Sequence, residues 1–371
     1  MTNTGRTVLS AVLPPATPQA EDVGRLPPAY RAPAAGRRGP LAEARPRNVF
    51  IETTNLCNSQ CATCPRTFTA FEPPKTLRLD EFVRTVEQFP DMERALLHGI
   101  GEPLLNKALP QMIAYLKARR VHVLINTNAT LLTEDWAHDL IESGLDELRV
   151  SLDSVRPETY HLIRGVPLLP RVMANLARFA GVQRRQQAGG PQVSLWMMAL
   201  RENLADLPGL IRFAAEVGVP EVYLQRLVYN TDDRDAPGWL AAGHAVFGSF
   251  DAQVDEMMAE GEVLAQSLGV ALRASGATTP RHSLGRQPAA RPWAACLRPW
   301  TTAYITANGN ALPCCLAPFA TMHYPDLILG NVHDNHFDEI WNARPAQTWR
   351  TRLLSDDPFE PCAGCGVHWS L

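Results

Sequence analysis

Three cysteines lie close together in one short segment, and their spacing is the first sign of chemistry in this chain. Cys57, Cys61 and Cys64 form the pattern C-x3-C-x2-C within ETTNLCNSQCATCPR (52–66). Thiolates are soft ligands that select zinc or iron–sulfur clusters. A closed structural site would take four protein ligands. Three thiols on one loop would instead hold three irons of a 4Fe–4S cluster and leave the fourth iron open to a substrate or cosubstrate.

A second group of cysteines follows residues 65–295, which contain none. Four of them show metal-site spacings, C-x12-G-x4-C and then C-x2-C: Cys296, Cys314, Cys362 and Cys365. The pattern predicts a second metal site, and a zinc ribbon remains the alternative to an iron–sulfur cluster. Cys315 is a fifth thiol, which we interpret as a buried neighbour rather than a ligand.

The composition excludes several other classes of protein. The 371 residues carry a net charge of -3 and 46% hydrophobic residues, which indicates a globular protein with a large core. The charge predicts no nucleic-acid partner, and the lack of an apolar run of about 18 residues predicts no membrane partner. No signal peptide is evident, so we expect a cytoplasmic location. Thiols stay reduced there, which favours metal sites over disulfides.

The elements that must position these cysteines follow a repeated strand–helix pattern. Short apolar runs, most of them followed by helical segments, occur at 49–51, 95–97, 121–125, 148–150, 193–200 and 222–224. Six units of this kind predict an α/β fold with a partial (β/α)6 parallel barrel. A full barrel of this type would need two more units.

Three parts of the chain differ in composition and pattern. Residues 1–46 are rich in proline and alanine and predict a disordered tail. Residues 47–275 hold the barrel and its extension, a helical stretch over 237–268 followed by a further strand at 269–275. Residues 276–371 form a small C-terminal domain, in which Asn308 and Gly309 mark the turn between two strands.

Polar or glycine-rich segments follow five of the six predicted strands. Parallel barrels collect their chemistry at the carboxyl ends of the strands. Besides the cysteine loop, these ends are HGIGEP (98–103), NTNA (126–129), SLDS (151–154) and QR (225–226). We expect a barrel mouth shaped around a polar ligand. Gln225 and Arg226 are candidates for substrate or adenine contact, and a surface ion pair is the alternative for Arg226.

Together these segments resemble the radical S-adenosylmethionine (radical SAM) superfamily over about residues 48–226. The resemblance implies that the three-cysteine loop holds a 4Fe–4S cluster whose open iron binds S-adenosylmethionine (SAM). GIGEPLL resembles the GGEP motif, TNATLL the TNG motif and SLD the ribose motif, and HLIRG resembles the segment whose arginine contacts the methionine carboxylate. The cofactor-binding residues implied in this way are Gly101, Glu102, Asn128, Ser151, Asp153 and Arg164.

Three positions depart from the pattern of the family. Ile100 stands where the first glycine of GGEP is usual, and Ala129 stands where TNG has glycine. Thr63 replaces an aromatic residue that often precedes the third cysteine. That position acts mainly through its backbone, so the departure leaves the interpretation unchanged.

The C-terminal cysteine pattern resembles a Twitch domain, the shortened relative of the SPASM domain. The resemblance implies an auxiliary 4Fe–4S cluster held by the four C-terminal cysteines named above. With four cysteine ligands this cluster would be closed, and it could relay an electron or serve only the structure.

The implied activity is reductive cleavage of SAM to methionine and a 5′-deoxyadenosyl radical, which abstracts hydrogen from a substrate C–H bond. The cofactor supplies the radical chemistry, and the protein positions the reacting groups and excludes water. We assign no side chain a direct catalytic role. An external electron donor such as flavodoxin or ferredoxin is the implied partner.

The substrate is the least determined part of the interpretation. Only 47 residues precede the first predicted strand, and they hold no pattern of a leader-binding domain. We therefore expect a small polar metabolite, such as a sugar or an aminocyclitol, rather than a peptide. The alternatives are a maturase that modifies a ribosomal peptide, a non-catalytic iron–sulfur electron-transfer protein and a zinc-binding structural protein.

Overall fold

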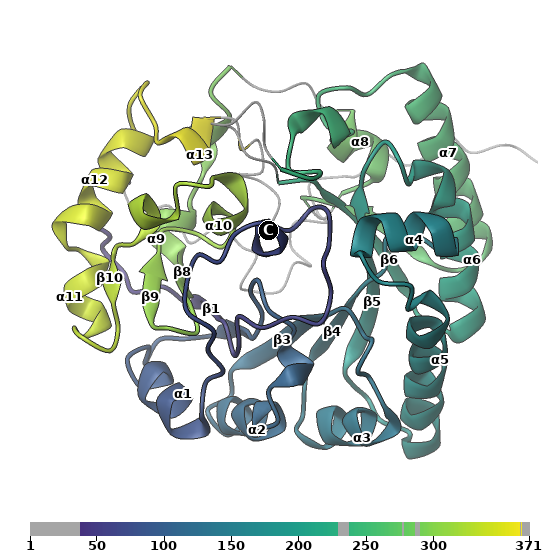
Figure 1. The fold of residues 1–371 in the computed structure, drawn as a ribbon, viewed down its shortest axis with the longest axis horizontal. Helices are drawn as coiled ribbons and strands as arrows, with labels where there is room; N and C mark the ends of the chain where they lie inside the picture. The colour runs from purple at the N-terminus through teal and green to yellow at the C-terminus, as the bar shows by residue number, and fades with distance from the viewer. Residues whose placement is uncertain (1–37, 229–236, 277, 286–289, 364, 366–371) are drawn as a thin grey trace, which may run out of the picture.

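The computed structural model describes residues 38–228, 237–276, 278–285, 290–363 and 365 (Figure 1). Most of the segment predicted to be a disordered tail therefore lies outside the described residues. Residues 38–46, which the sequence assigned to that tail, pack against the C-terminal domain. Ala42 is buried, its backbone N–H donates to Asn342 Oδ1 at 2.9 Å, and Arg45 pairs with Asp338 at 2.6 Å.

A sheet of ten strands runs through the described residues in the order β10-β9-β8-β1-β2-β3-β4-β5-β6-β7. The run from β8 to β7 is parallel throughout, and β9 and β10 add to it as antiparallel neighbours. The strands are β1 (Asn48–Ile51), β2 (Arg94–Leu96), β3 (His122–Thr127), β4 (Glu147–Ser151), β5 (Gln192–Ala199), β6 (Glu221–Arg226), β7 (Ala271–Ala274), β8 (Thr302–Ile305), β9 (Asn310–Leu312) and β10 (Gly330–Asn331).

The first six strands are those that the sequence predicted, so the expected α/β barrel core is confirmed. The predicted strand at 269–275 is present as β7. Helices cover the outer face of the strands (Figure 1). The described helices are α1 (Leu79–Val86), α2 (Leu109–Ala118), α3 (Glu134–Glu142), α4 (Pro157–Arg164), α5 (Leu169–Gln186), α6 (Leu207–Val217), α7 (Ala252–Ser267), α8 (Pro280–Leu284), α9 (Arg298–Thr301), α10 (Ala317–Ala320), α11 (Phe337–Trp341), α12 (Arg344–Leu353) and α13 (Glu360–Ala363).

Short 3-10 helices complete the connections, and local sequence explains where helices begin and end. The 3-10 helices are η3 (Pro65–Thr67), η4 (Pro103–Leu105), η5 (Leu204–Asp206), η6 (Ala242–His244), η7 (Pro292–Ala295) and η8 (Tyr324–Leu327). Thr133 caps α3 because its hydroxyl accepts the Trp136 N–H. Among the described residues, no helix combines the length and apolarity that crossing a bilayer requires.

Side chains of each strand alternate between two apolar clusters. In β1, Val49 and Ile51 join the large core between sheet and helices, whereas Phe50 points to the other face. There Phe50 packs with Leu96, and Tyr304 and Trp349 from the C-terminal domain join the same cluster. Residues of the C-terminal domain therefore cover part of the sheet face that bears Phe50.

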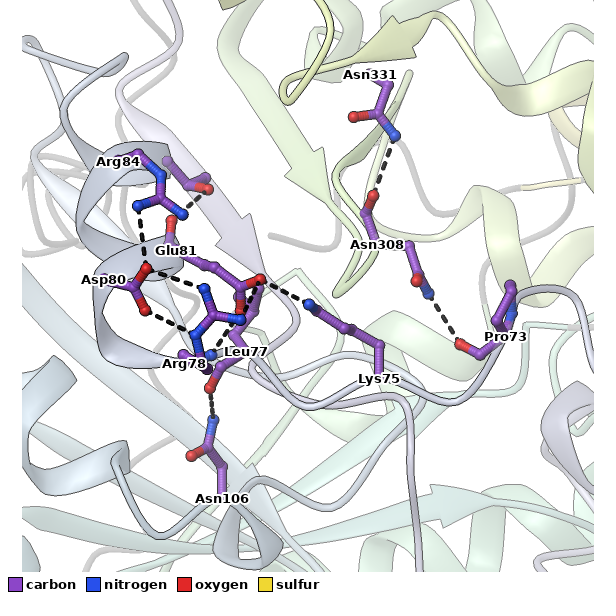
Figure 2. A network of polar contacts seen from close by, with 11 residues as sticks. Pro73, Lys75, Leu77, Arg78, Asp80, Glu81, Arg84, Asn106, Asn308 and Asn331 are labelled. Carbon is purple, nitrogen blue, oxygen red and sulfur yellow. Dashed lines mark hydrogen bonds and ion pairs between the residues drawn. The ribbon is translucent and has the colours of Figure 1, made fainter.

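The C-terminal domain is joined to the barrel by main-chain pairing, because β8 lies parallel to β1 along its whole length. The β8–β9 turn at Asn308 and Gly309, predicted from sequence, is present, and Gly309 has φ of +89°. Figure 2 shows the loop before α1 beneath this turn: Asn308 Nδ2 donates to the Pro73 carbonyl at 3.0 Å, and Lys75 pairs with Glu81 at 2.7 Å. The boundary that the sequence suggested near residue 276 is therefore crossed by one continuous sheet.

Candidate functional site

The three-cysteine loop follows β1 and is held from the side by the end of α4. The Gln60 N–H donates to the Arg164 carbonyl at 3.2 Å, and the Ala62 N–H donates to the Ile163 carbonyl at 2.8 Å. Gly165 ends α4 with φ of +68°, and a Cβ at this glycine would lie 2.2 Å from the Gln60 carbonyl oxygen. Only glycine permits both this conformation and this approach. The backbone of the cysteine loop is thus fixed by its neighbours.

The thiols of this loop are half-buried and lie within electrostatic reach of one another. Burial is the main cause that raises the pKa of Cys57, of Cys61 and of Cys64, for Cys64 to about 12. Thiolates in such a place require a compensating cation, as an iron–sulfur cluster provides. Three soft thiolate donors on one loop fit an iron–sulfur cluster with one open iron.

Glu102 connects two of the predicted motifs. Its buried carboxylate accepts hydrogen bonds from Thr127 Oγ1 and from the Asn128 N–H, both at 2.7 Å. Burial raises the pKa of Glu102, and the hydrogen bond from the Asn128 N–H opposes this effect. A Cβ at Gly101 would lie 2.1 Å from the Thr54 carbonyl oxygen, so the glycine lets this segment press against the cysteine loop.

Asn128 reaches the cysteine loop from the end of β3. Its Nδ2 donates to Asn58 Oδ1 at 2.8 Å and to Ser59 Oγ at 3.2 Å, and it lies 3.9 Å from Cys57 Sγ. Ala129 has φ of +56°, in the left-handed region. The usual glycine of this motif would take that conformation freely, whereas alanine takes it at a cost in backbone strain.

Asp153 and Arg164 form an ion pair next to the cysteine loop. Arg164 Nε lies 2.7 Å from Asp153 Oδ2, and Asp153 Oδ1 accepts the Met198 N–H at 2.8 Å. Burial raises the pKa of Asp153, and the Arg164 charge opposes this effect. Arg164 Nη1 lies 3.9 Å from Cys61 Sγ, and Ser151 is half-buried at the end of β4. The resemblance assigned these residues to different parts of the cosubstrate, and the structure brings the carboxylate and guanidinium together.

Arg226 is not a surface residue, so the alternative of a surface ion pair is wrong. Its guanidinium is buried, lies 3.7 Å from the centre of the Phe247 ring and donates to the Ser283 carbonyl. The Arg226 N–H donates to Ser275 Oγ at 3.1 Å. Gln225 is half-buried at the end of β6, opposite Met198 of β5. Of these two candidates, Gln225 is the one whose side chain stays partly exposed.

Glu52 is a residue that the sequence analysis did not single out. It directly follows β1 and is 2% exposed. Its carboxylate accepts the Tyr304 hydroxyl, the Ile100 N–H at 3.1 Å and the Ala307 N–H at 3.2 Å. A Cβ at Gly99 would lie 2.1 Å from Glu52 Cγ. Glu52 therefore ties the GIGEP segment to the C-terminal domain, and a charged residue directly after an apolar strand was the signal for it.

His98 is the second residue that sequence reasoning missed. It follows β2, and its ring lies 5.4 Å from the ring of Phe50 in an edge-to-face arrangement. Burial, followed by the charges of Arg149 and Arg94, lowers the pKa of His98 to about 3. The imidazole is therefore neutral at physiological pH. The signal in the sequence was a histidine at the start of a glycine-rich strand end.

The four C-terminal cysteines line one cavity, which has space of about 480 Å³ including its open side. Its other described lining residues are apolar except for one: Trp293, Arg298, Pro299, Leu316, Ala317, Ala320, Trp349, Leu353 and Pro361. Burial raises the pKa of the Cys314 and Cys362 thiols, so this cavity also favours a positively charged inorganic group. Cys315 does not line the cavity. It is buried in the apolar cluster that contains Phe50 and Tyr304.

Two family models match the two cysteine regions. The model of the radical SAM superfamily matches residues 51–214, and that of the SPASM iron–sulfur cluster-binding domain matches residues 296–366. Two PqqA peptide cyclases are similar over most of the chain. That of Granulibacter bethesdensis is 25% identical over 87% of this chain and 81% of its own length, and that of Gluconobacter oxydans is 26% identical over 86% and 82%.

Solved structures with the same fold include peptide-binding proteins. SuiB of Streptococcus suis superposes with a TM-score of 0.64 at 14% identity, over 88% of this chain and 72% of SuiB. SuiB bound to its precursor peptide SuiA gives a TM-score of 0.62. The protein anSMEcpe, solved with SAM and a peptide, gives 0.60 at 15% identity over 86% of this chain and 89% of its own.

Proposed function

The chain belongs to the radical SAM superfamily and carries a C-terminal SPASM iron–sulfur domain, and from this premise we propose that it is a maturase that modifies a ribosomally made peptide. The observation that carries the proposal is the similarity to PqqA peptide cyclases, which extends over 87% of the chain. The fold shared with SuiB, a protein solved with its precursor peptide, is compatible with it.

This proposal replaces the expectation of a small sugar-like or aminocyclitol substrate, and with it the expectation that a small molecule is the preferred partner. Both were wrong because they depended on the residues before the first predicted strand. That feature does not outweigh similarity to peptide cyclases over more than four fifths of the chain.

The two domains carry 4Fe–4S clusters, and SAM is the cosubstrate. When bound, these groups supply a 5′-deoxyadenosyl radical that takes hydrogen from a substrate C–H bond. Cys57, Cys61 and Cys64 hold the core cluster. Glu102 and Asn128 orient the loop that receives the methionine amino group, because their hydrogen bonds join that loop to the cysteine loop.

The ion pair of Arg164 with Asp153 brings together residues for two parts of the cosubstrate. Asp153, with Ser151 at the same strand end, would accept the ribose hydroxyls, and Arg164 would bind the methionine carboxylate. Because the two side chains are already paired before SAM binds, little orientation entropy is lost on binding. The four C-terminal cysteines hold the auxiliary cluster. Reduced flavodoxin or ferredoxin supplies electrons, and the reaction takes place in the cytoplasm.

Peptides encoded beside the gene provide the test. Reconstituted enzyme, SAM and a reductant should produce 5′-deoxyadenosine and a peptide whose mass has decreased by two hydrogen atoms. The matched control is the Cys57→Ala, Cys61→Ala, Cys64→Ala variant, which should give neither product. Formation of 5′-deoxyadenosine with every candidate peptide unchanged, together with modification of a small molecule, would overturn the proposal.

A further inference from the structure

One charged side chain lines the apolar cavity of the C-terminal domain. Arg298 begins α9, two residues after Cys296, and is 3% exposed. Among the described lining residues, Arg298 is the only Arg, Lys, His, Asp or Glu. The remaining wall consists of aliphatic, proline and tryptophan side chains. The guanidinium is therefore kept from bulk water on the side where the four cysteines lie.

Arg298 and the four cysteines line the same cavity, and the arginine is separated from Cys296 by one residue in the chain. Charges interact several times more strongly in a medium of low polarity than in water. A cation here therefore acts on whatever the four thiolates hold.

We propose that Arg298 is a tuning residue that raises the reduction potential of the auxiliary cluster and so makes it an electron acceptor. Each one-electron reduction adds one negative charge to the cluster. A fixed positive charge beside it stabilises the reduced form more than the oxidised form. Charge, hydrogen bonds and solvent exposure are the means by which proteins set such potentials. The inference rests on the proposed function for its role, and on the proposed four-cysteine ligand set for its site.

The electron that this cluster would accept comes from the peptide. Removal of a hydrogen atom leaves a carbon radical, which forms a bond to a second peptide position. That step releases one proton to solvent and leaves one excess electron. The oxidised auxiliary cluster would accept this electron, and an oxidised carrier of the flavodoxin or ferredoxin class would then receive it. A higher potential at this cluster favours the transfer.

The test is a redox titration of the full-length reconstituted protein, with the auxiliary signal isolated by repeating it in the Cys57→Ala, Cys61→Ala, Cys64→Ala background. Electron paramagnetic resonance reports the reduced fraction. In Arg298→Met the ratio of reduced to oxidised cluster should fall at least tenfold at a fixed potential near the wild-type midpoint, which for a one-electron couple equals a downward shift of about 59 mV. Arg298→Lys, which keeps the charge, should retain most of the wild-type potential.

Arg352→Met is the matched control, because Arg352 stacks on Phe359 in the same domain but remains 36% exposed. Water and salt screen its charge, so its loss should leave the potential unchanged. Arg298→Gln provides a second neutral variant if Arg298→Met binds less iron. An unchanged potential in a neutral variant with full iron content would overturn the tuning role. So would loss of the auxiliary cluster from both neutral variants, since this would assign Arg298 to cluster retention.

The titration needs no substrate. If no peptide product is found, a measured shift in potential would still support the tuning role of Arg298. If no shift is found, the proposal of a peptide substrate would be unaffected.

Discussion

The two cysteine regions of this protein are built in different ways. The loop with Cys57, Cys61 and Cys64 is held by hydrogen bonds to the end of α4 and to Asn128, which follows β3. The C-terminal region is a cavity with apolar walls, four cysteines and the buried Arg298. A site with three thiols and many polar neighbours suits a cosubstrate that must enter and leave. An apolar site with four thiols suits a group that exchanges only electrons.

Breaking the first region should have the largest effect. The Cys57→Ala, Cys61→Ala, Cys64→Ala variant should bind about four irons per chain, compared with about eight for the wild type. It should show no cleavage of SAM, because the open iron is lost with its loop. Iron analysis and chromatography of 5′-deoxyadenosine measure both quantities. Full cleavage activity in this variant would remove the radical mechanism.

Breaking the second region should separate cleavage from product formation. In Cys362→Ala, Cys365→Ala, formation of 5′-deoxyadenosine should continue because the barrel site is intact. Formation of the modified peptide should be lost because the excess electron has no acceptor. The ratio of the two products, measured by mass spectrometry, decides the outcome. An undiminished product yield would show that the auxiliary cluster takes no part in the oxidation.

The polar neighbours of the first region should matter for affinity and not for iron content. Glu102→Ala and Asp153→Ala each remove buried hydrogen-bond acceptors that orient the binding loops. The loss on the order of 1–3 kcal/mol corresponds to SAM binding weakened by about 5- to 150-fold. Calorimetric titration with SAM measures it on variants with normal iron. Unchanged affinity in both variants would place the cosubstrate elsewhere.

The contact of Glu52 with the C-terminal domain should give the smallest effect, a change in the stability of the fold. Burial raises the pKa of Glu52 to about 7 from an ordinary value of 4.5. Folding therefore favours the protonated carboxyl, and the stability this contributes is complete below about pH 4.5 and is lost as the pH rises through about 7. Glu52→Gln cannot titrate, so its unfolding free energy should vary less over this range, by at most on the order of 3 kcal/mol.

Scanning calorimetry of wild-type protein and Glu52→Gln at several pH values checks this prediction. Glu339→Gln, at an exposed carboxylate on α11, serves as the control and should follow the wild type. If wild-type protein and Glu52→Gln show the same pH dependence of stability, burial does not raise the pKa of the Glu52 carboxyl.

The sequence was enough to predict the order of the barrel strands and the position of Cys57, Cys61 and Cys64 after the first of them. Apolar runs of strand length alternate with helical patterns, and this local signal suffices because every parallel strand must exit at the same edge. The turn at Asn308 and Gly309 was likewise local, since the residue types alone favour it. The superfamily followed from four motifs in order, which the match over residues 51–214 confirms.

Only the tertiary structure decided how the two regions are joined. The pairing of β8 with β1 links residues about 250 positions apart, and no local pattern reports such a contact. The same is true of Glu52, whose role depends on Tyr304, and of Arg226, whose buried place depends on Phe247. Arg298 is the clearest case. In the sequence, Arg298 is only an arginine next to a proline. Its charge becomes important because folding places it in one cavity with four cysteines and an apolar wall.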